Sequence, residues 1–465
     1  LALSCIMEIN DKGVVIGHEI AETLIRVDRR MTYTAVNAII TDDDAETKEK
    51  YKEFVDLFLQ MKELSQLLRK RRQERGAIDF DFPESKILLD AKGRPIEIKP
   101  YERNAATKLI EDFMLMANET VAEDYYWQEM PFLYRIHEKP DEEKMAKLGT
   151  FINNFGYTLR MPGGEVHPKE LQKLLEKIEG TPEEALLSRL TLRSMKQAKY
   201  STVNSGHFGL AAKYYTHFTS PIRRYPDLSL HRAIKYLLAQ EQGHKGNTTE
   251  TGGYHYSMEE MLQLGQHCSM AERRADEATR DVSDWLKCDF MLDQVGNVFK
   301  GVIASVTGFG FFVRLDELFI DGLVHVSSLD NDYYRFDQVG QRLTGESSGQ
   351  MYRLGDRVEV RVEAVNMDER KIDFSLISSE RAPRNVGKTE REKAKKGPAN
   401  KNGSRRRQVG KKVNFEPDSA FRGEKKQKPK AAKKDARKAK KPSEKTQKIA
   451  AATKAKRAAK KKVAE

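Results

Sequence analysis

The sequence has 465 residues, enough for two or three domains with a substantial buried core. Its mean hydropathy of −0.68, with no apolar run near the roughly 18 residues of a membrane span, argues against membrane-spanning helices. We therefore expect no membrane partner. Its three cysteines have no CxxC or Cys/His spacing, which argues against a disulfide framework or a zinc site, so we expect a cytoplasmic location.

The net charge of +12 is unevenly distributed along the chain. Residues 383–465 contain 31 Lys and Arg against 8 Asp and Glu, a net charge of +23, so the preceding residues carry −11. A strongly basic appendage on an acidic body predicts a nucleic-acid partner. A solvated appendage that only improves solubility is the alternative interpretation.

Alternating apolar residues predict two strands within residues 1–33. Because the chain opens inside the first of them and lacks an initial Met, we expect Leu1 to be a cut point. An apolar spacing of three and four predicts a helix from Asp44 to Arg75, which Gly76 ends. The same patterns predict short strands at 77–82 and 86–89, and helices at 105–122, 142–155, 168–177 and 182–199.

The longest periodic segment spans residues 258–292. Its apolar positions recur at steps of four and three, which predicts a helix with one buried face made by Leu264, Cys268, Ala271, Ala275, Ala278, Val282 and Trp285. After about Ser379 the chain loses apolar residues and fills with Lys, Ala and Arg. Such a segment cannot bury enough surface to offset its ordering entropy, so we expect disorder there.

Between these segments, residues 297–378 change to a period of two with glycine turns. Five short strands are expected, at 298–303, 310–315, 322–325, 357–365 and 371–376. Five is the strand number of an oligonucleotide-binding (OB) barrel. The segments GVIASVTGFGFFVRL, DGLVHVSSL and LGDRVEVRVEAVNMDERKIDFSL resemble the S1-type RNA-binding domain.

The S1 resemblance implies an RNA-binding face. It places Phe309, Phe312 and His325 on one exposed surface with Lys371, and Arg370 as a further candidate, beside them. Aromatic rings stack on unpaired bases and adjacent cations hold phosphates, which supports this interpretation. Strand alternation puts Phe311 on the face opposite Phe312, so at least one ring points inward. The alternative is that all three phenylalanines belong to the core.

The segment GHFGLAAKYYTHFTSPIRRYPDLSLHR is dense in aromatic and basic residues. Its histidines are 10 and 14 residues apart, so we expect no metal site among them. Thr219 and Ser220 are expected to cap a helix that starts at Pro221 and presents Arg223 and Arg224 in its first turn. Two guanidiniums beside a helix N-terminus suit a phosphate or its transition state.

The same segment resembles the signature of the RNB family, exoribonucleases that degrade RNA from the 3′ end. Other blocks agree: RMTYTAVNAII, GAIDFDFPE, RNAATKLIEDFMLMANETVA, FLYRIHEKP and AERRADEATRDVSDWL. The resemblance implies an α+β fold, in which a truncated RNB catalytic domain precedes an S1-type OB-fold barrel and a disordered basic tail. The expected bounds are 1–293, 296–378 and 379–465. Within the family, the tail favours the branch whose members carry a basic extension.

The resemblance also assigns roles to single residues. Tyr33 matches the tyrosine that packs against the 3′-terminal nucleotide, although from the residues alone it would be a core tyrosine at a strand end. Arg223 matches the catalytic arginine at the scissile phosphate, and Arg224 is expected as a second catalytic contact to phosphate. Glu277, or else Glu272, is expected near the pocket.

The family's chemistry needs aspartates that hold Mg²⁺, in a motif of the type D-x-x-x-x-x-D-x-D-D. We find no such motif in this chain and expect it upstream of Leu1, so we assign no metal ligand within the chain and expect Mg²⁺ for the complete enzyme. Two hypotheses remain. One is a C-terminal fragment of a processive 3′→5′ exoribonuclease that releases nucleoside 5′-monophosphates, with no turnover by the fragment alone. The other is a non-catalytic RNA-binding polypeptide. Expected partners are single-stranded and structured RNA, with the ribosome as a further candidate, and the expected state is a monomer.

Overall fold

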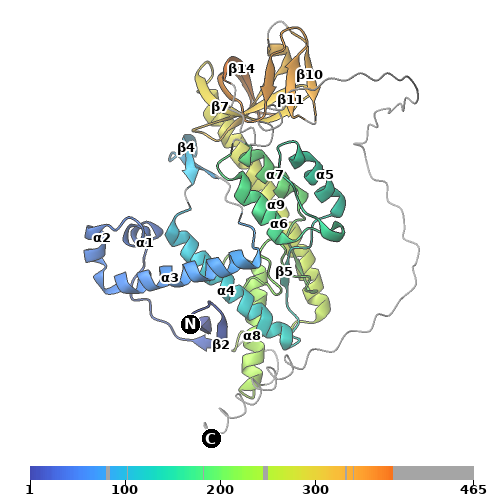
Figure 1. The fold of residues 1–465 in the computed structure, drawn as a ribbon. Helices are drawn as coiled ribbons and strands as arrows, with labels where there is room; N and C mark the ends of the chain where they lie inside the picture. The colour runs from blue at the N-terminus through green and yellow to red at the C-terminus, as the bar shows by residue number, and fades with distance from the viewer. Residues whose placement is uncertain are drawn as a thin grey trace, which may run out of the picture. The chain divides into compact units, whose positions relative to one another are not determined.

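The computed structural model describes residues 1–380, except 80–83, 102, 182, 245–249, 330, 331 and 339. These residues form helices and small two-stranded sheets, followed by a closed five-stranded barrel (Figure 1). The predicted α+β class with a C-terminal barrel is therefore confirmed. Apart from its first two residues, the predicted disordered tail lies outside the described part of the chain. No helix in the described part is long and apolar enough to cross a membrane.

The predicted N-terminal hairpin is present as β1 (Ala2–Ile9) and β2 (Val15–Thr23), which pair antiparallel. The Asn10 side chain closes the turn by accepting hydrogen bonds from the backbone N–H groups of Lys12 and Val14. Helix α1 (Tyr33–Ile40) follows and was not predicted. Its N-cap is Thr32, whose hydroxyl accepts a hydrogen bond from the Ala35 N–H.

The single helix predicted from Asp44 to Arg75 is wrong, because two helices occupy that span. They are α2 (Ala45–Lys50) and α3 (Lys52–Arg75), separated by Tyr51, whose φ of −121° and ψ of 29° are not helical. The apolar spacing continues across the break, so periodicity alone does not reveal it. The predicted end at Gly76 is confirmed, since this glycine has the left-handed conformation with φ of 102°.

Buried ion pairs join α3 to α4 (Ala105–Trp127). The Asp112 carboxylate is buried and accepts hydrogen bonds from the Ser65 hydroxyl at 2.6 Å and from Arg69 and Arg72 at 2.7 Å each. Further along α3, Arg75 donates to both carboxylate oxygens of Glu119 and to the Leu210 carbonyl. These bonds tie α3 and α4 to the loop that precedes the arginine-rich turn.

Short elements complete the part of the chain before the barrel. Two hairpin sheets pair β3 (Glu84–Leu89) with β4 (Pro95–Tyr101), and β5 (Tyr134–Ile136) with β6 (Lys199–Ser201). The helices are η1 (Pro162–Gly164), α5 (Glu142–Asn153), α6 (Pro168–Ile178), α7 (Glu184–Ser194) and α8 (Tyr225–Glu241).

Two of the predicted bounds in this region are wrong. Residues 77–79 are not a strand, and the rest of the strand predicted at 77–82 lies outside the described residues. The helix predicted to run to residue 199 ends at Ser194, because residues 199–201 form β6.

Helix α9 (Met258–Leu292) has the predicted bounds and appears in Figure 1 as one long helix. The predicted continuous buried face is wrong, because Val282 and Trp285 are 58% and 44% exposed. Only the two ends of α9 are buried. Its first turns join a core cluster through Met261 and Cys268, and its last turns join the barrel core through Cys288 and Met291.

The barrel strands close in the order β13-β14-β9-β8-β7. They are β7 (Val298–Thr307), β8 (Gly310–Leu315), β9 (Asp321–His325), β13 (Arg357–Asn366) and β14 (Lys371–Glu380), which confirms the five predicted strands. A short turn, η2 (Val326–Ser328), follows β9. A separate sheet of β10 (Tyr334–Asp337), β11 (Arg342–Gly345) and β12 (Met351–Arg353) was not predicted.

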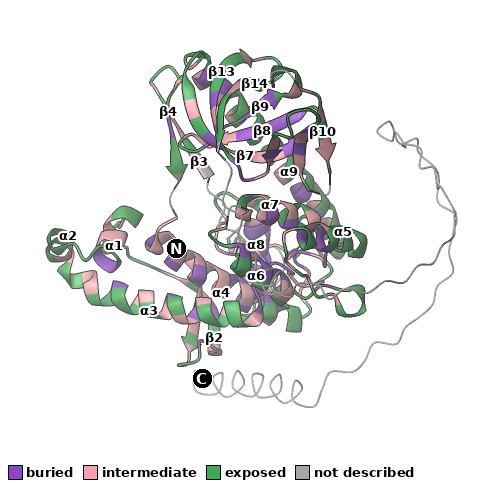
Figure 2. Ribbon diagram, turned by 45° about the horizontal axis from the view of Figure 1, so that its top comes forward, coloured by how far each residue is buried: buried purple, intermediate pink, exposed green. Residues whose placement is uncertain are grey.

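The barrel is filled by side chains from alternate positions of its strands. In Figure 2 the buried residues appear as purple stretches of the barrel ribbon. Phe311 on β8 is fully buried. Its neighbour Gly310 has a φ of 151°, and a Cβ there would lie 2.2 Å from the Val324 carbonyl oxygen. Only glycine therefore permits the close approach of β8 and β9 at this position.

The substitution Asp112→Ala should strongly destabilise the fold, because it leaves two partly buried guanidiniums without their carboxylate. We expect the free energy of unfolding to fall by about 3 kcal/mol or more, measured by urea denaturation. The control is Glu97→Ala, which removes an exposed ion pair with Lys99 and should cost less than about 1 kcal/mol. Equal losses in the two variants would contradict the assigned role of Asp112.

Candidate functional site

The arginine-rich segment forms a turn that precedes α8. The predicted helix start at Pro221 is wrong, because α8 begins at Tyr225 and Arg224 is its N-cap residue. The Ser220 carbonyl accepts hydrogen bonds from the N–H groups of Arg223 and Arg224, which closes the turn before the helix starts. Ser220 therefore contributes its backbone rather than a capping side chain.

One buried carboxylate fixes both ends of this turn. The Oδ1 atom of Asp227 accepts a hydrogen bond from the Ser220 N–H and another from the Arg224 guanidinium, each 2.8 Å long. Asp227 is fully buried, so water does not compete for these bonds. Arg224 is thereby held by the protein itself, whereas the sequence suggested a phosphate contact.

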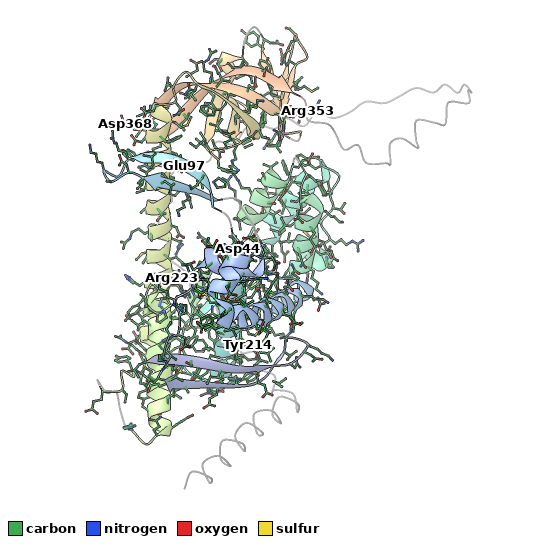
Figure 3. All side chains as sticks on the ribbon, turned by 90° about the vertical axis from the view of Figure 1, so that its left-hand side faces the viewer. Asp44, Glu97, Tyr214, Arg223, Arg353 and Asp368 are labelled. Atoms are coloured by element: carbon green, nitrogen blue, oxygen red, sulfur yellow. The ribbon has the colours of Figure 1, made fainter. Side chains whose placement is uncertain are left out.

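Arg223, in contrast, points into solvent. Its side chain, labelled in Figure 3, is exposed. Within the described part of the chain it makes no ion pair. The preceding residue, Ile222, is fully exposed, and the first residue of α8, Tyr225, is half-exposed. The turn therefore presents an exposed guanidinium on a backbone that is held by Ser220, which suits the binding of an anion.

Behind the turn lies a network of polar and aromatic side chains from distant parts of the chain. The Tyr200 hydroxyl and His217 Nδ1 form a hydrogen bond of 2.8 Å. The Arg135 guanidinium lies over the Tyr200 ring, 4.7 Å from its centroid, and donates to Glu272 of α9 at 2.6 Å. The network thus joins β5, β6 and α9 to the segment that leads into the turn.

The histidines of this region are held neutral. Burial lowers the pKa of His217 to about 2, helped by the positive charges of Arg224, Arg135 and Arg223. Burial likewise lowers the pKa of His207 to about 3. Of these three guanidiniums, Arg135 is paired with Glu272 and Arg224 with Asp227, so only the charge of Arg223 lacks a carboxylate partner among the described residues.

The segment before the turn is anchored by Asn118 of α4. Its side-chain amide donates to the Tyr215 hydroxyl at 3.3 Å and accepts from the Phe218 N–H at 3.0 Å. The Phe218 carbonyl accepts a 2.7 Å hydrogen bond from Nε2 of His231. Residues 215–218 are therefore held on both sides by buried polar groups.

Tyr33 lies apart from this network. It is the first residue of α1 and is 53% exposed, so the alternative of a core tyrosine at a strand end is wrong. No hydrogen bond or ring contact among the described residues joins it to the arginine-rich turn. Of the two candidate glutamates, Glu272 belongs to the network and Glu277 is exposed on α9.

The predicted aromatic pair is present on the barrel surface. The rings of Phe309 and Phe312 meet edge to face with centroids 6.3 Å apart, and Phe309 is 50% exposed. Phe311 is in the core, so the alternative that all three rings are buried is wrong. His325, at the end of β9, is exposed and pairs in register with Gly310, next to Phe309.

Lys371 begins β14 and is also exposed, but its ammonium group pairs with Glu369 at 2.7 Å. The adjacent Arg370 pairs with Asp281 of α9. The barrel face therefore combines two rings and an imidazole, while its two expected cations are held by carboxylates.

A metal site would need several ligating side chains that the fold brings together. Among the described residues, no group of three or more His, Cys, Asp and Glu side chains could hold a metal ion. Asp227, the carboxylate that binds the arginine-rich turn, is already engaged by Arg224. These residues do not fit a magnesium centre on their own.

The two arginines were predicted from the sequence, whereas the residues that hold them were not. Asp227 stands in the same motif, three residues after Arg224, and an acidic residue at that spacing in the first turn of a helix is a signal that could have been used. Asn118, Arg135 and Tyr200 carry no such signal, because they approach the site only through the fold.

Two family models match the chain. The RNB domain matches residues 1–240, and the S1 RNA binding domain matches residues 292–377. Ribonuclease R of Escherichia coli (strain K12) is 66% identical over 466 residues, which cover 100% of this chain and 57% of that protein. Ribonuclease R of Vibrio cholerae is 47% identical over 407 residues, which cover 87% of this chain and 49% of that protein.

Solved structures are similar as well. Mycoplasma genitalium RNase R in complex with ribose methylated single-stranded RNA has a TM-score of 0.70 and 27% identity. The match covers 80% of this chain and 57% of that one. The chain therefore spans only about half the length of the proteins that it matches.

The neutral histidines predict a pH dependence of stability. The folded pKa values of His207 and His217 lie below the unfolded value of about 6.5, so the unfolded chain binds more protons as the pH falls. Their contribution is complete above about pH 6.5 and is lost between there and about pH 3, by roughly 1.4 kcal/mol per pH unit for each histidine.

Urea denaturation at several pH values measures this slope. The variants His207→Gln and His217→Gln should each reduce the slope between pH 6 and pH 4, whatever their effect at pH 7. The control His244→Gln removes an exposed histidine after α8 and should leave the slope unchanged. An unaltered slope in both network variants would contradict the neutral assignment.

Proposed function

We propose a function from one premise: the chain belongs to the RNB family, in its ribonuclease R branch. We propose that it forms the C-terminal part of an exoribonuclease that degrades RNA processively from the 3′ end to nucleoside 5′-monophosphates. The observation that carries the proposal is Arg223, an exposed guanidinium on a turn whose backbone is hydrogen-bonded, with no carboxylate partner in the part of the chain that the structure describes. Phosphoryl chemistry needs such a preorganised cation where negative charge develops.

The residues around Arg223 divide the work of binding a scissile phosphate. Arg223 would contact the phosphate directly and stabilise its charge. Arg224 is paired with Asp227 and would stabilise the conformation of the turn. It could make a second contact to phosphate only if this ion pair rearranges. The neutral His217 would neither add charge nor act as a base at pH 7, because its pKa is about 2.

A divalent metal ion is consistent with the family, and we propose Mg²⁺ for the complete enzyme. When bound, such an ion activates water and stabilises the leaving oxygen. Since the described residues do not fit that centre, the roles proposed for Arg223, Arg224 and Asp227 are independent of it.

The barrel would grip the RNA. Phe309 and Phe312 offer two stacking surfaces for unpaired bases, and His325 adds a third ring beside them. The ion pair of Lys371 with Glu369 is exposed, so it can exchange its carboxylate for a phosphate at little cost. Tyr33, exposed at the start of α1, remains our candidate for packing against the 3′-terminal nucleotide.

We further propose single-stranded and structured RNA as the partners, with the ribosome as an additional partner of the basic tail. The Mycoplasma relative has been solved with single-stranded and with double-stranded RNA, which supports both RNA forms. The proposed parts are an RNB catalytic portion at 1–293, an S1 domain at 296–378 and a basic tail at 379–465. We also propose that the protein is a monomer and is located in the cytoplasm.

The substitution Arg223→Ala tests the catalytic proposal in the full-length protein that carries this chain. Loss of one preorganised donor should lower kcat by about 100-fold or more, with a small change in RNA affinity. The assay follows nucleoside 5′-monophosphates released from 3′-labelled single-stranded RNA in the presence of Mg²⁺. Arg223→Lys should recover only part of the rate, because an ammonium group lacks the planar fork of donors.

The matched control is Arg280→Ala, which removes an exposed arginine from the middle of α9 and should leave kcat unchanged. Internal cleavage, or release from the 5′ end, would contradict the proposed polarity. RNA binding without any release of nucleotides by the full-length protein would favour the binding-only alternative.

A further inference from the structure

The three-stranded sheet β10–β12 is firmly attached to the barrel. Its register aligns Phe336, Leu343 and Tyr352 in one row across the strands. Leu343 and Tyr352 are buried in the barrel core, and the Tyr352 ring lies 5.1 Å from that of Phe311. This face of the sheet is therefore an extension of the core.

The opposite face is rich in arginine. Strand alternation turns the two neighbouring rows away from the core; they are Arg335-Thr344-Met351 and Asp337-Arg342-Arg353. These rows hold three guanidiniums and one carboxylate. Asp337 accepts hydrogen bonds from Arg342, while Arg335 is exposed and makes no ion pair in the described part of the chain. We call these two rows, together with Tyr333, the outer face; Arg353 marks it in Figure 3.

Tyr333 stands at the edge of this face with its ring in solvent. The side chain is 85% exposed, yet its backbone is fixed. The Tyr333 carbonyl accepts a hydrogen bond from the Glu346 N–H, and the preceding Asp332 carboxylate accepts from the N–H groups of Ser347 and Ser348. These hydrogen bonds hold the pKa of Asp332 well below its usual range, so the anchor persists at neutral pH.

An aromatic ring that is exposed to solvent on an anchored backbone is well placed to bind a ligand. Burial of such a ring is favourable, and fixing its backbone in advance lowers the entropy cost of binding. Together with the exposed guanidinium of Arg335 on the same face of the sheet, the ring matches the combination that binds single-stranded nucleic acid: bases stack on the ring and phosphates contact the cation.

We propose that the outer face is a second surface for single-stranded RNA, in which Tyr333 stacks on a base and Arg335 contacts phosphate. It is built from β10–β12, whereas the surface of Phe309, Phe312 and His325 belongs to β8, β9 and the turn between β7 and β8. The inference extends the proposed RNA-binding function and rests on it. An acidic peptide could also use the arginine, but every nucleotide of a single strand offers both a base to stack on Tyr333 and a phosphate for Arg335, which favours RNA.

Photo-cross-linking of the full chain locates both surfaces in one experiment. The probe is a single-stranded RNA of about 20 nucleotides with 4-thiouridine throughout, and mass spectrometry identifies the linked residues. We expect cross-links at Tyr333 in addition to the Phe309 and Phe312 region. Cross-links confined to that region would overturn the second surface and leave the proposed function intact. Cross-links at neither surface would contradict RNA binding by the barrel itself.

Substitutions supply an independent readout of affinity by fluorescence anisotropy. Tyr333→Ala should weaken binding of this RNA at least about fivefold, whereas Tyr333→Phe, which keeps the ring, should bind normally. Arg335→Ala should reduce the slope of log affinity against log salt by about 0.7, the value for one phosphate contact on a single strand. The basic tail is present in every variant, so its contribution is common to all.

The matched control is Arg361→Ala, which removes an exposed arginine of the same domain from β13, where Glu359 and Glu363 share its face. It should change neither affinity nor salt slope. Thermal melting should be the same for all four variants, since each altered side chain is exposed. Equal RNA affinities of Tyr333→Ala and the control would overturn the proposal. Loss of the cross-links at Tyr333 when polyglutamate is added in excess, but not when unlabelled RNA is added, would also overturn it.

Discussion

The structure around the arginine-rich turn depends on buried and partly buried carboxylates that pair with arginines of this chain. Asp112 holds Arg69 and Arg72, Glu119 holds Arg75, and Asp227 holds Arg224. A guanidinium paired in this way orients backbone and side chains but has little capacity left for a ligand. Arg223 differs because no carboxylate among the described residues pairs with it, and its backbone is nevertheless fixed by Ser220. The anion-binding role that we propose for this turn depends on that exposed guanidinium.

Local patterns predicted the elements whose formation depends on local interactions. The bounds of α9 and the five barrel strands agree with periodicity, and the resemblance to the RNB family and the S1 domain is confirmed by the family matches. Burial was harder to predict, because an apolar stripe does not say whether a neighbour covers it. Val282 and Trp285 fit the stripe and remain exposed. Strands of three or four residues, as in β10–β12, are too short for a periodic signal.

The site was predictable only where its residues share one motif. Arg223 and Arg224 were identified, but the start of α8 was predicted four residues too early. Ser220 was expected to cap the helix with its side chain, whereas its backbone N–H is bonded to the Asp227 carboxylate. Partners from other elements were not accessible to such reasoning. Arg135 meets Glu272 across 137 residues of sequence, and Asn118 meets Phe218 across 100. Contacts of this range are consequences of packing, and no spacing rule anticipates them.

The exposed middle of α9 connects the barrel to the network behind the arginine-rich turn. Glu272 is bonded to Arg135 beside the arginine-rich turn, and nine residues later Asp281 is bonded to Arg370 of the barrel. At a rise of 1.5 Å per residue these anchors are about 14 Å apart along one helix. The residues of α9 between these two anchors are exposed, so little packing surrounds the helix in this span. One continuous helix therefore connects the barrel to the network behind the arginine-rich turn, so under the proposed function a displacement of the barrel by bound RNA would reach that network through α9.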